Sequence, residues 1–80
     1  PDAVLSGPIY LGAGVRVKGG VHIEGPTVIR NDTIVDSRAS ISHSIIWRGC
    51  YIGEDVRLEG TIVGRGCSIK SKAMLKEGSV

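Results

Sequence analysis

The chain has 80 residues, enough for one small domain, and its formal net charge is only +2. Basic residues alternate with Asp and Glu along the sequence, so no basic patch for nucleic acid is expected. No apolar run approaches the ~20 residues that a membrane-spanning helix needs. We therefore expect neither a nucleic-acid partner nor a membrane partner.

Aliphatic residues recur every six positions through the first half of the chain: Leu11, Val17, Ile23, Ile29, Val35 and Ile41. A small or branched residue stands two positions before each of them: Ile9, Val15, Val21, Thr27, Thr33 and Ala39. A period of six does not fit an α-helix. One inward aliphatic residue per short strand fits a parallel β-helix, in which three such repeats make one triangular coil.

The repeat continues after Ile41 with two shortened steps, to Ile46 and later to Val63. The spacing predicts one coil of 18 residues followed by coils of 17: Ile9–Pro26, Thr27–His43, Ser44–Gly60 and Thr61–Glu77. We expect residues 1–8 to form a lead-in segment and residues 9–80 to form an all-β domain of about four coils. Because neither end shows a cap, we expect this domain to be a fragment of a longer chain.

The residues between the expected strands are suited to tight corners. Gly, Asn and Asp tolerate the positive φ that such corners often need. They occur at Gly14, Asn31-Asp32, Gly49, Asp55 and Gly66. These positions support the same register as the aliphatic repeat.

One side of the expected prism differs from the other two. We name the sides in chain order, so that side A contains Leu11, side B Val17 and side C Ile23. Because side chains alternate along a strand, the neighbours of each inward residue point outward. Sides B and C present mainly polar residues, whereas side A presents an apolar patch of the kind that favours a contact surface: Tyr10, Val28, Ile45, Trp47 and Ile62.

Two basic residues border this patch. Arg48 and Arg65 occupy equivalent positions in successive coils. They are candidates either for the rim of an interface or for an anion site.

The two cysteines, Cys50 and Cys67, also occupy equivalent positions in successive coils, and both are expected to point inward. Side chains stacked in register point the same way rather than at each other, so we expect reduced thiols that act as small core residues. This cysteine usage favours a cytoplasmic protein.

Two segments, Leu11–Arg16 and Ile52–Arg57, resemble the transferase hexapeptide repeat. The resemblance covers residues 9–80, and it implies the left-handed form of the parallel β-helix. The runs Ser6–Gly12, Ser44–Trp47 and Gly60–Gly64 are similar to the C-terminal β-helix of sugar-nucleotide pyrophosphorylases, above all to mannose-1-phosphate guanylyltransferase-like proteins.

That resemblance implies a scaffold and not a catalytic centre. In such proteins an N-terminal domain carries the nucleotidyltransferase chemistry with Mg²⁺ and a nucleoside triphosphate. The β-helix serves subunit assembly, and docking or regulation of that domain. We therefore expect no catalytic residue, no metal site and no cofactor in this segment, and we expect its partners to be its own catalytic domain and a second copy.

Two alternatives stay open at this stage. The first is a hexapeptide acyltransferase with His43 as general base, since His43 lies at a corner where a subunit cleft can form, whereas His22 is expected to be exposed beside Glu24. The second is a scaffold like that of translation initiation factor subunits. Two histidines are too few for the three-histidine zinc site of the carbonic anhydrases that share this repeat.

Overall fold

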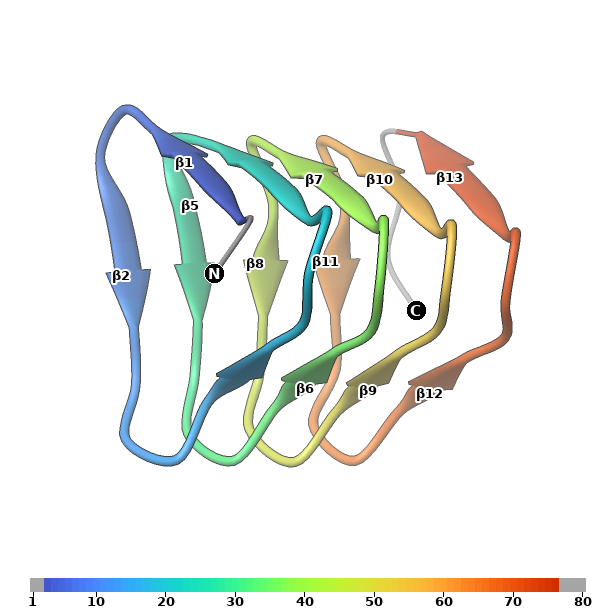
Figure 1. Cartoon of the computed structure of the whole chain (residues 1–80). Coiled ribbons are helices and arrows are strands. Elements are labelled where there is room, and N and C mark those ends of the chain that lie inside the picture. Colours follow the sequence, from blue (N-terminus) through green and yellow to red (C-terminus); the bar gives the residue numbers. More distant parts are fainter. Residues whose placement is uncertain (1–2, 77–80) are drawn as a thin grey trace.

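The computed structural model describes residues 3–76, and over this range the chain forms short strands and no helix. The strands assemble into three parallel sheets, one on each side of a prism (Figure 1). Side A contains β2 (Ile9–Leu11), β5 (Thr27–Ile29), β8 (Ile45–Ile46) and β11 (Ile62–Val63). Side B contains β3 (Arg16–Val17), β6 (Ile34–Val35), β9 (Tyr51–Ile52) and β12 (Ser68–Ile69). Side C contains β1 (Val4–Ser6), β4 (His22–Glu24), β7 (Ser40–Ser42), β10 (Arg57–Glu59) and β13 (Met74–Lys76).

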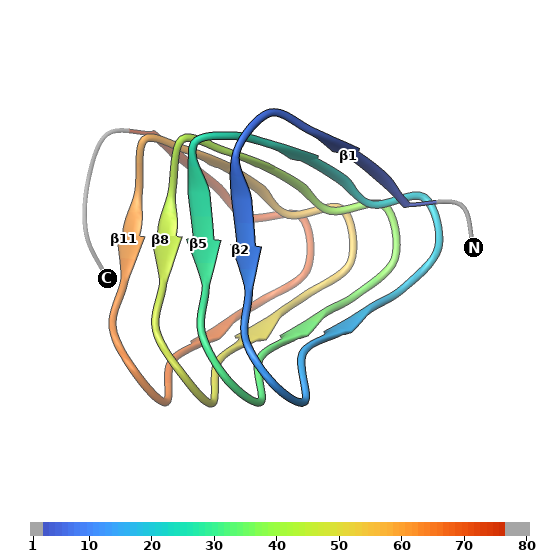
Figure 2. The ribbon, with the colours of Figure 1, turned by 90° about the vertical axis from the view of Figure 1, so that its left-hand side faces the viewer.

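The coils wind in a left-handed sense, as the hexapeptide resemblance implied. In Figure 1 the chain descends along side A, passes to the right along side B and returns over the top along side C. Figure 2 places the N-terminal coil nearest to the viewer of Figure 1, so this anticlockwise path recedes from that viewer. The all-β parallel β-helix of about four coils is thereby confirmed. No helix within residues 3–76 is long and apolar enough to cross a membrane.

The strand register agrees with the predicted change in coil length. Val28 pairs with Tyr10 across 18 residues and with Ile45 across 17. The difference arises at the corner between sides C and A, where Gly25-Pro26 is replaced in the next coil by the single residue His43. His43 makes that shorter corner with a φ of 49°.

The β-helix begins earlier than the expected lead-in segment allows. Residues 4–6 form β1, which pairs in parallel with β4 along its whole length. The physical reason is that Leu5 stands at the inward position of side C and pairs with Ile23. The boundary that we placed after residue 8 therefore cuts through the first coil.

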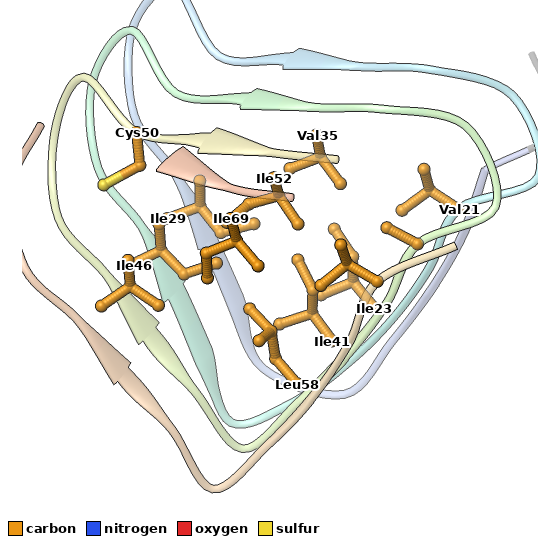
Figure 3. Close-up of a cluster of buried hydrophobic side chains, with 13 residues drawn as sticks. Val21, Ile23, Ile29, Val35, Ile41, Ile46, Cys50, Ile52, Leu58 and Ile69 are labelled. Atoms are coloured by element: carbon orange, nitrogen blue, oxygen red, sulfur yellow. The ribbon is translucent and has the colours of Figure 1, made fainter. Parts of the chain in front are cut away.

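The predicted inward residues form the core. Their side chains stack along the axis of the prism, one ladder on each side (Figure 3). Ile29, Ile46 and Ile52 are completely buried, whereas Leu11, in the first coil, is 37% exposed because no preceding coil covers it. Each coil thus depends on its neighbours for burial, as in other solenoids.

Buried hydroxyl groups in this core all have hydrogen-bonding partners. The hydroxyl of Thr27 donates to the carbonyl of Glu24 at 2.7 Å, and that of Thr33 donates to the carbonyl of Trp47 at 2.9 Å. No buried side-chain nitrogen or oxygen within residues 3–76 lacks a partner. The core therefore tolerates polar residues at its corners without the cost of an unsatisfied group.

The corners adopt the left-handed backbone conformation at most of the predicted positions. Gly14, Asp32, Gly49 and Gly66 have φ between 61° and 74° and stack at the corner between sides A and B. Asp55 has a φ of 58° at the corner between sides B and C.

Cys50 is buried and forms no disulfide, in agreement with the sequence prediction. Its thiol donates to the carbonyl of Gly64 at 3.0 Å. Burial raises the pKa of this thiol, so little reactive thiolate forms near neutral pH.

We expect a Cys67→Ser variant, in which Cys50 alone can react, to be alkylated by iodoacetamide far more slowly than a small-molecule thiol. The rate should approach that of the small thiol once the protein is unfolded in urea. Mass spectrometry over time measures both rates. Fast modification of the folded variant at pH 8 would contradict the buried position of Cys50.

Candidate functional site

Side A carries a continuous column of outward apolar side chains. Tyr10, Val28, Ile45 and Ile62 are direct neighbours across β2, β5, β8 and β11. Tyr10 is 55% exposed, Ile45 40% and Ile62 47%. Val28 in the middle of the column is half-buried. The structure thus brings together four of the five residues predicted for the interface.

Trp47 lies beside this column, immediately after β8. Its backbone N–H donates to the carbonyl of Val63 at 3.0 Å, which fixes it in the stack, and its side chain is 42% exposed. The guanidinium carbon of Arg30, from the preceding coil, lies 5.3 Å from the centre of the indole ring. This distance is within the range of a cation–π contact. We call the five residues Tyr10, Val28, Ile45, Trp47 and Ile62 the apolar face.

Arg48 and Arg65 both lie at the corner between sides A and B. The N–H of Gly66 donates to the carbonyl of Arg48 at 3.0 Å, so the two arginines belong to adjacent, stacked corners. Together with Arg30, Asn31 and Trp47 they line a shallow cavity of about 270 Å³. We call the three guanidinium groups of Arg30, Arg48 and Arg65 the arginine corner.

Two side-chain contacts elsewhere on the prism involve charged residues. On side B the hydroxyl of Tyr51 donates to the carboxylate of Asp36, which lowers the pKa of Asp36 and raises that of Tyr51. At the next corner Arg38 donates to Asp55 at 3.0 Å and lowers its pKa. Because both carboxyl pKa values are lowered from 3.8 on folding, these contacts stabilise the protein above that pH and lose their effect below it.

The two histidines occupy different places in the fold, His43 a corner and His22 a strand. His43 is exposed at its corner, and its ring makes no hydrogen bond to another residue of the described range. His22 is exposed on β4, where it lines a shallow groove together with Glu24, Ser40 and Ser42. An acyltransferase base needs a group that orients it toward the acceptor. Among residues 3–76 no three His, Cys, Asp or Glu side chains gather into a possible metal site.

Arg30 is the residue that the sequence reasoning missed. Its backbone N–H donates to the carbonyl of Ile46 at 2.8 Å, which places it directly against the next coil. The signal was present in the register, because Arg30 and Trp47 hold the same position in successive coils. The register therefore placed the two residues next to each other, although it did not specify the contact between their side chains.

Comparison with known proteins gives one family and one fold. The family model "GMPPB C-terminal domain" matches residues 1–80. The chain is 36% identical over 67 residues to a probable mannose-1-phosphate guanyltransferase of Schizosaccharomyces pombe, covering 76% of this chain and 16% of that protein. It is 32% identical over 72 residues to a UTP–glucose-1-phosphate uridylyltransferase of Synechocystis, covering 89% of this chain and 19% of that protein. The chain therefore spans less than a fifth of the length of these relatives.

Among solved structures, the acetyltransferase domain of PglB from Neisseria gonorrhoeae superposes with a TM-score of 0.68 over the whole chain and 46% of that domain. The identity is 19%, so this likeness shows the fold alone. The two sugar-phosphate nucleotidyltransferases and the family model agree with each other and with the hexapeptide architecture. This chain belongs to the GMPPB C-terminal domain family of β-helices, the C-terminal domains of sugar-nucleotide pyrophosphorylases.

Proposed function

We propose that this domain is the assembly module of a sugar-nucleotide pyrophosphorylase of the mannose-1-phosphate guanylyltransferase type. Family membership and the names of two relatives support this proposal. In it, a separate N-terminal domain binds Mg²⁺ and the nucleoside triphosphate and performs the transfer. The β-helix joins subunits through the apolar face and docks or regulates that catalytic domain. The buried thiol of Cys50, which forms no disulfide, supports a cytoplasmic location.

The observation that carries the proposal is the apolar column of side A. Three of its four members are at least 40% exposed, although they stand next to one another across the sheet. Monomeric proteins rarely leave so continuous an apolar patch in water. Sides B and C hold charged or hydroxyl-bearing residues at most of the equivalent positions.

The column also suits pairing with a second copy. A two-fold axis that lies in the interface, parallel to the strands of side A and between Val28 and Ile45, would set Val28 against Ile45 and Tyr10 against Ile62 of the partner. Apolar groups then meet only apolar groups, as an isologous interface requires. The domain measures 28 × 24 × 19 Å, so one face buries less than the roughly 800 Å² per partner of a standard interface. The isolated domain is therefore expected to form a weak dimer.

We expect an Ile45→Ser/Ile62→Ser variant to abolish this association. Sedimentation equilibrium over a range of protein concentrations measures it. The apparent mass of the wild-type domain should rise from the monomer mass of 8.4 kDa toward twice that value, whereas the variant should remain at the monomer mass. Both substitutions are at exposed positions, so the free energy of unfolding should change by only ~0.5 kcal/mol per site.

A matched control is available on side C. Val4 is 52% exposed and Met74 is 65% exposed, so Val4→Ser/Met74→Ser removes as much exposed apolar surface from a different side. This variant should associate as the wild type does. Equal association of the side A variant and the wild type would exclude the apolar face as the interface.

A further inference from the structure

The arginine corner collects positive charge that the protein does not neutralise. The ion pair between Arg38 and Asp55 is the one that residues 3–76 contain, so none of the three guanidinium groups of the corner is paired with a carboxylate. Arg48 and Arg65 are one coil apart, which is about 4.8 Å between strand neighbours. Like charges stacked at this separation destabilise the folded protein.

One acidic residue near the corner, Asp32, offsets only part of this charge, because it forms no ion pair with any of the three arginines. Asp32 belongs to the same row of corners, but its carboxylate leans over Gly14 in the preceding coil. Arg65 lies two coils further along, on the opposite side of Arg48. The corner therefore retains an excess of positive charge toward its C-terminal coils.

One of the three guanidinium groups is held in place before any ligand arrives. The guanidinium carbon of Arg30 lies over the Trp47 ring at 5.3 Å from its centre, and within residues 3–76 no carboxylate pairs with this guanidinium. A planar guanidinium with free N–H groups binds phosphate oxygens in a bidentate manner. Fixing the side chain beforehand lowers the entropic cost of binding.

The corner also leaves room for a ligand. The two corner glycines, Gly49 and Gly66, have no atom within 4 Å of the place where a Cβ would stand. With Asp32, Arg48 and Arg65 they line a second shallow cavity of about 350 Å³, which two basic residues and one acidic residue therefore border. Both arginines line both concavities, so a ligand with two anionic groups can contact both arginines at once.

We propose that the arginine corner binds a diphosphate group, with Arg48 and Arg65 as its principal ligands and Arg30 as a third, held by Trp47. The diphosphate could belong to inorganic pyrophosphate or to a nucleoside diphosphate, which share this chemistry. The site is next to the apolar face but does not use its aliphatic column. The two surfaces share Trp47, so the test of the site uses a variant of the aliphatic column that leaves Trp47 in place.

Binding at this site can be followed by the intrinsic fluorescence of the protein. Trp47 is the single Trp of the sequence, so tryptophan emission reports on the corner directly. We expect titration of the 80-residue protein with inorganic pyrophosphate to change that emission saturably. The affinity should weaken as salt is added, because screening acts on exposed charges.

An Arg48→Gln/Arg65→Gln variant should bind pyrophosphate at least roughly 10-fold more weakly, the usual consequence of losing charge-assisted hydrogen bonds. The control is an Arg16→Gln/Arg57→Gln variant, which removes the same amount of charge from sides B and C. Its affinity for pyrophosphate should stay within about twofold of that of the wild type. The Ile45→Ser/Ile62→Ser variant retains the corner and should bind pyrophosphate like the wild type, even though it no longer associates.

Titration with ADP separates the two sources of the diphosphate. Tighter binding of ADP than of pyrophosphate would identify a nucleotide, with the base contributing to affinity. Equal affinities for ADP and pyrophosphate would show that the site recognises the diphosphate group alone. The proposal is overturned if wild-type emission does not change saturably with either ligand, or if the two double-arginine variants weaken binding equally.

Discussion

Replacement of Ile46 by Ala is expected to lower the free energy of unfolding by about 2–5 kcal/mol. Ile46 is completely buried in the inward stack between Ile29 and Val63, and a cavity there cannot be filled from solvent. Urea denaturation followed by circular dichroism measures the change, through a lower midpoint at an unchanged slope.

The control for this prediction is the preceding residue. Ile45 has the same side chain in the same strand but points outward and is 40% exposed. The Ile45→Ala substitution should lower the free energy of unfolding by less than about 1 kcal/mol. Equal losses for the two variants would contradict the assignment of inward and outward positions.

Replacement of Gly53 by Ala is expected to lower the free energy of unfolding by about 1–3 kcal/mol. A Cβ at Gly53 would stand 2.8 Å from both the carbonyl oxygen of Ile69 and the nitrogen of Ser71. Both are backbone atoms of the next coil and cannot rotate away as a side chain would. The added methyl group must therefore push two coils apart, where the N–H of Gly53 donates to Ile69 at 2.9 Å. Thermal unfolding measures the effect.

Gly19 provides the same substitution without the contact. No atom lies within 4 Å of a Cβ built there, and its backbone is outside the left-handed region. Gly19→Ala should leave stability unchanged or raise it by up to about 1 kcal/mol, because Ala lowers the entropy of the unfolded chain. A loss of stability at Gly19 comparable to that at Gly53 would show that close approach between coils is not the cause.

The core of the fold could be predicted from the sequence because its signal is local and repeated. Each inward residue, such as Ile29 or Ile52, is set by its six-residue interval and by the alternation of side chains along a strand. The shortened steps of five residues even located the corner at His43. The first strand, β1, was missed although Leu5 stands six residues before Leu11 and continues the same interval.

Other corners could not be predicted from residue type. Arg38 and Lys72 have φ of 60° and 67°, although neither side chain favours the left-handed region. They adopt it because the hydrogen bonds between coils fix the path of the backbone. The N–H of Arg38, for example, donates to the carbonyl of Gly19 at 3.1 Å.

For the candidate site, the sequence predicted which residues share a side but not how their side chains pair. The alignment of Tyr10, Val28, Ile45 and Ile62 follows from register alone. The contact of Arg30 with Trp47 depends on the rotamers of two long side chains, which no periodicity specifies.

The most direct test of the assembly role is an amide NMR spectrum of the domain recorded at increasing protein concentration. Our interpretation predicts that signals from side A shift with concentration, above all those of Val28 and Ile45 at the centre of its column, while signals from sides B and C stay in place. Concentration-dependent shifts centred on β6 and β9, or on β7 and β10, would contradict a role of side A in assembly, and so would a spectrum that does not change at any concentration.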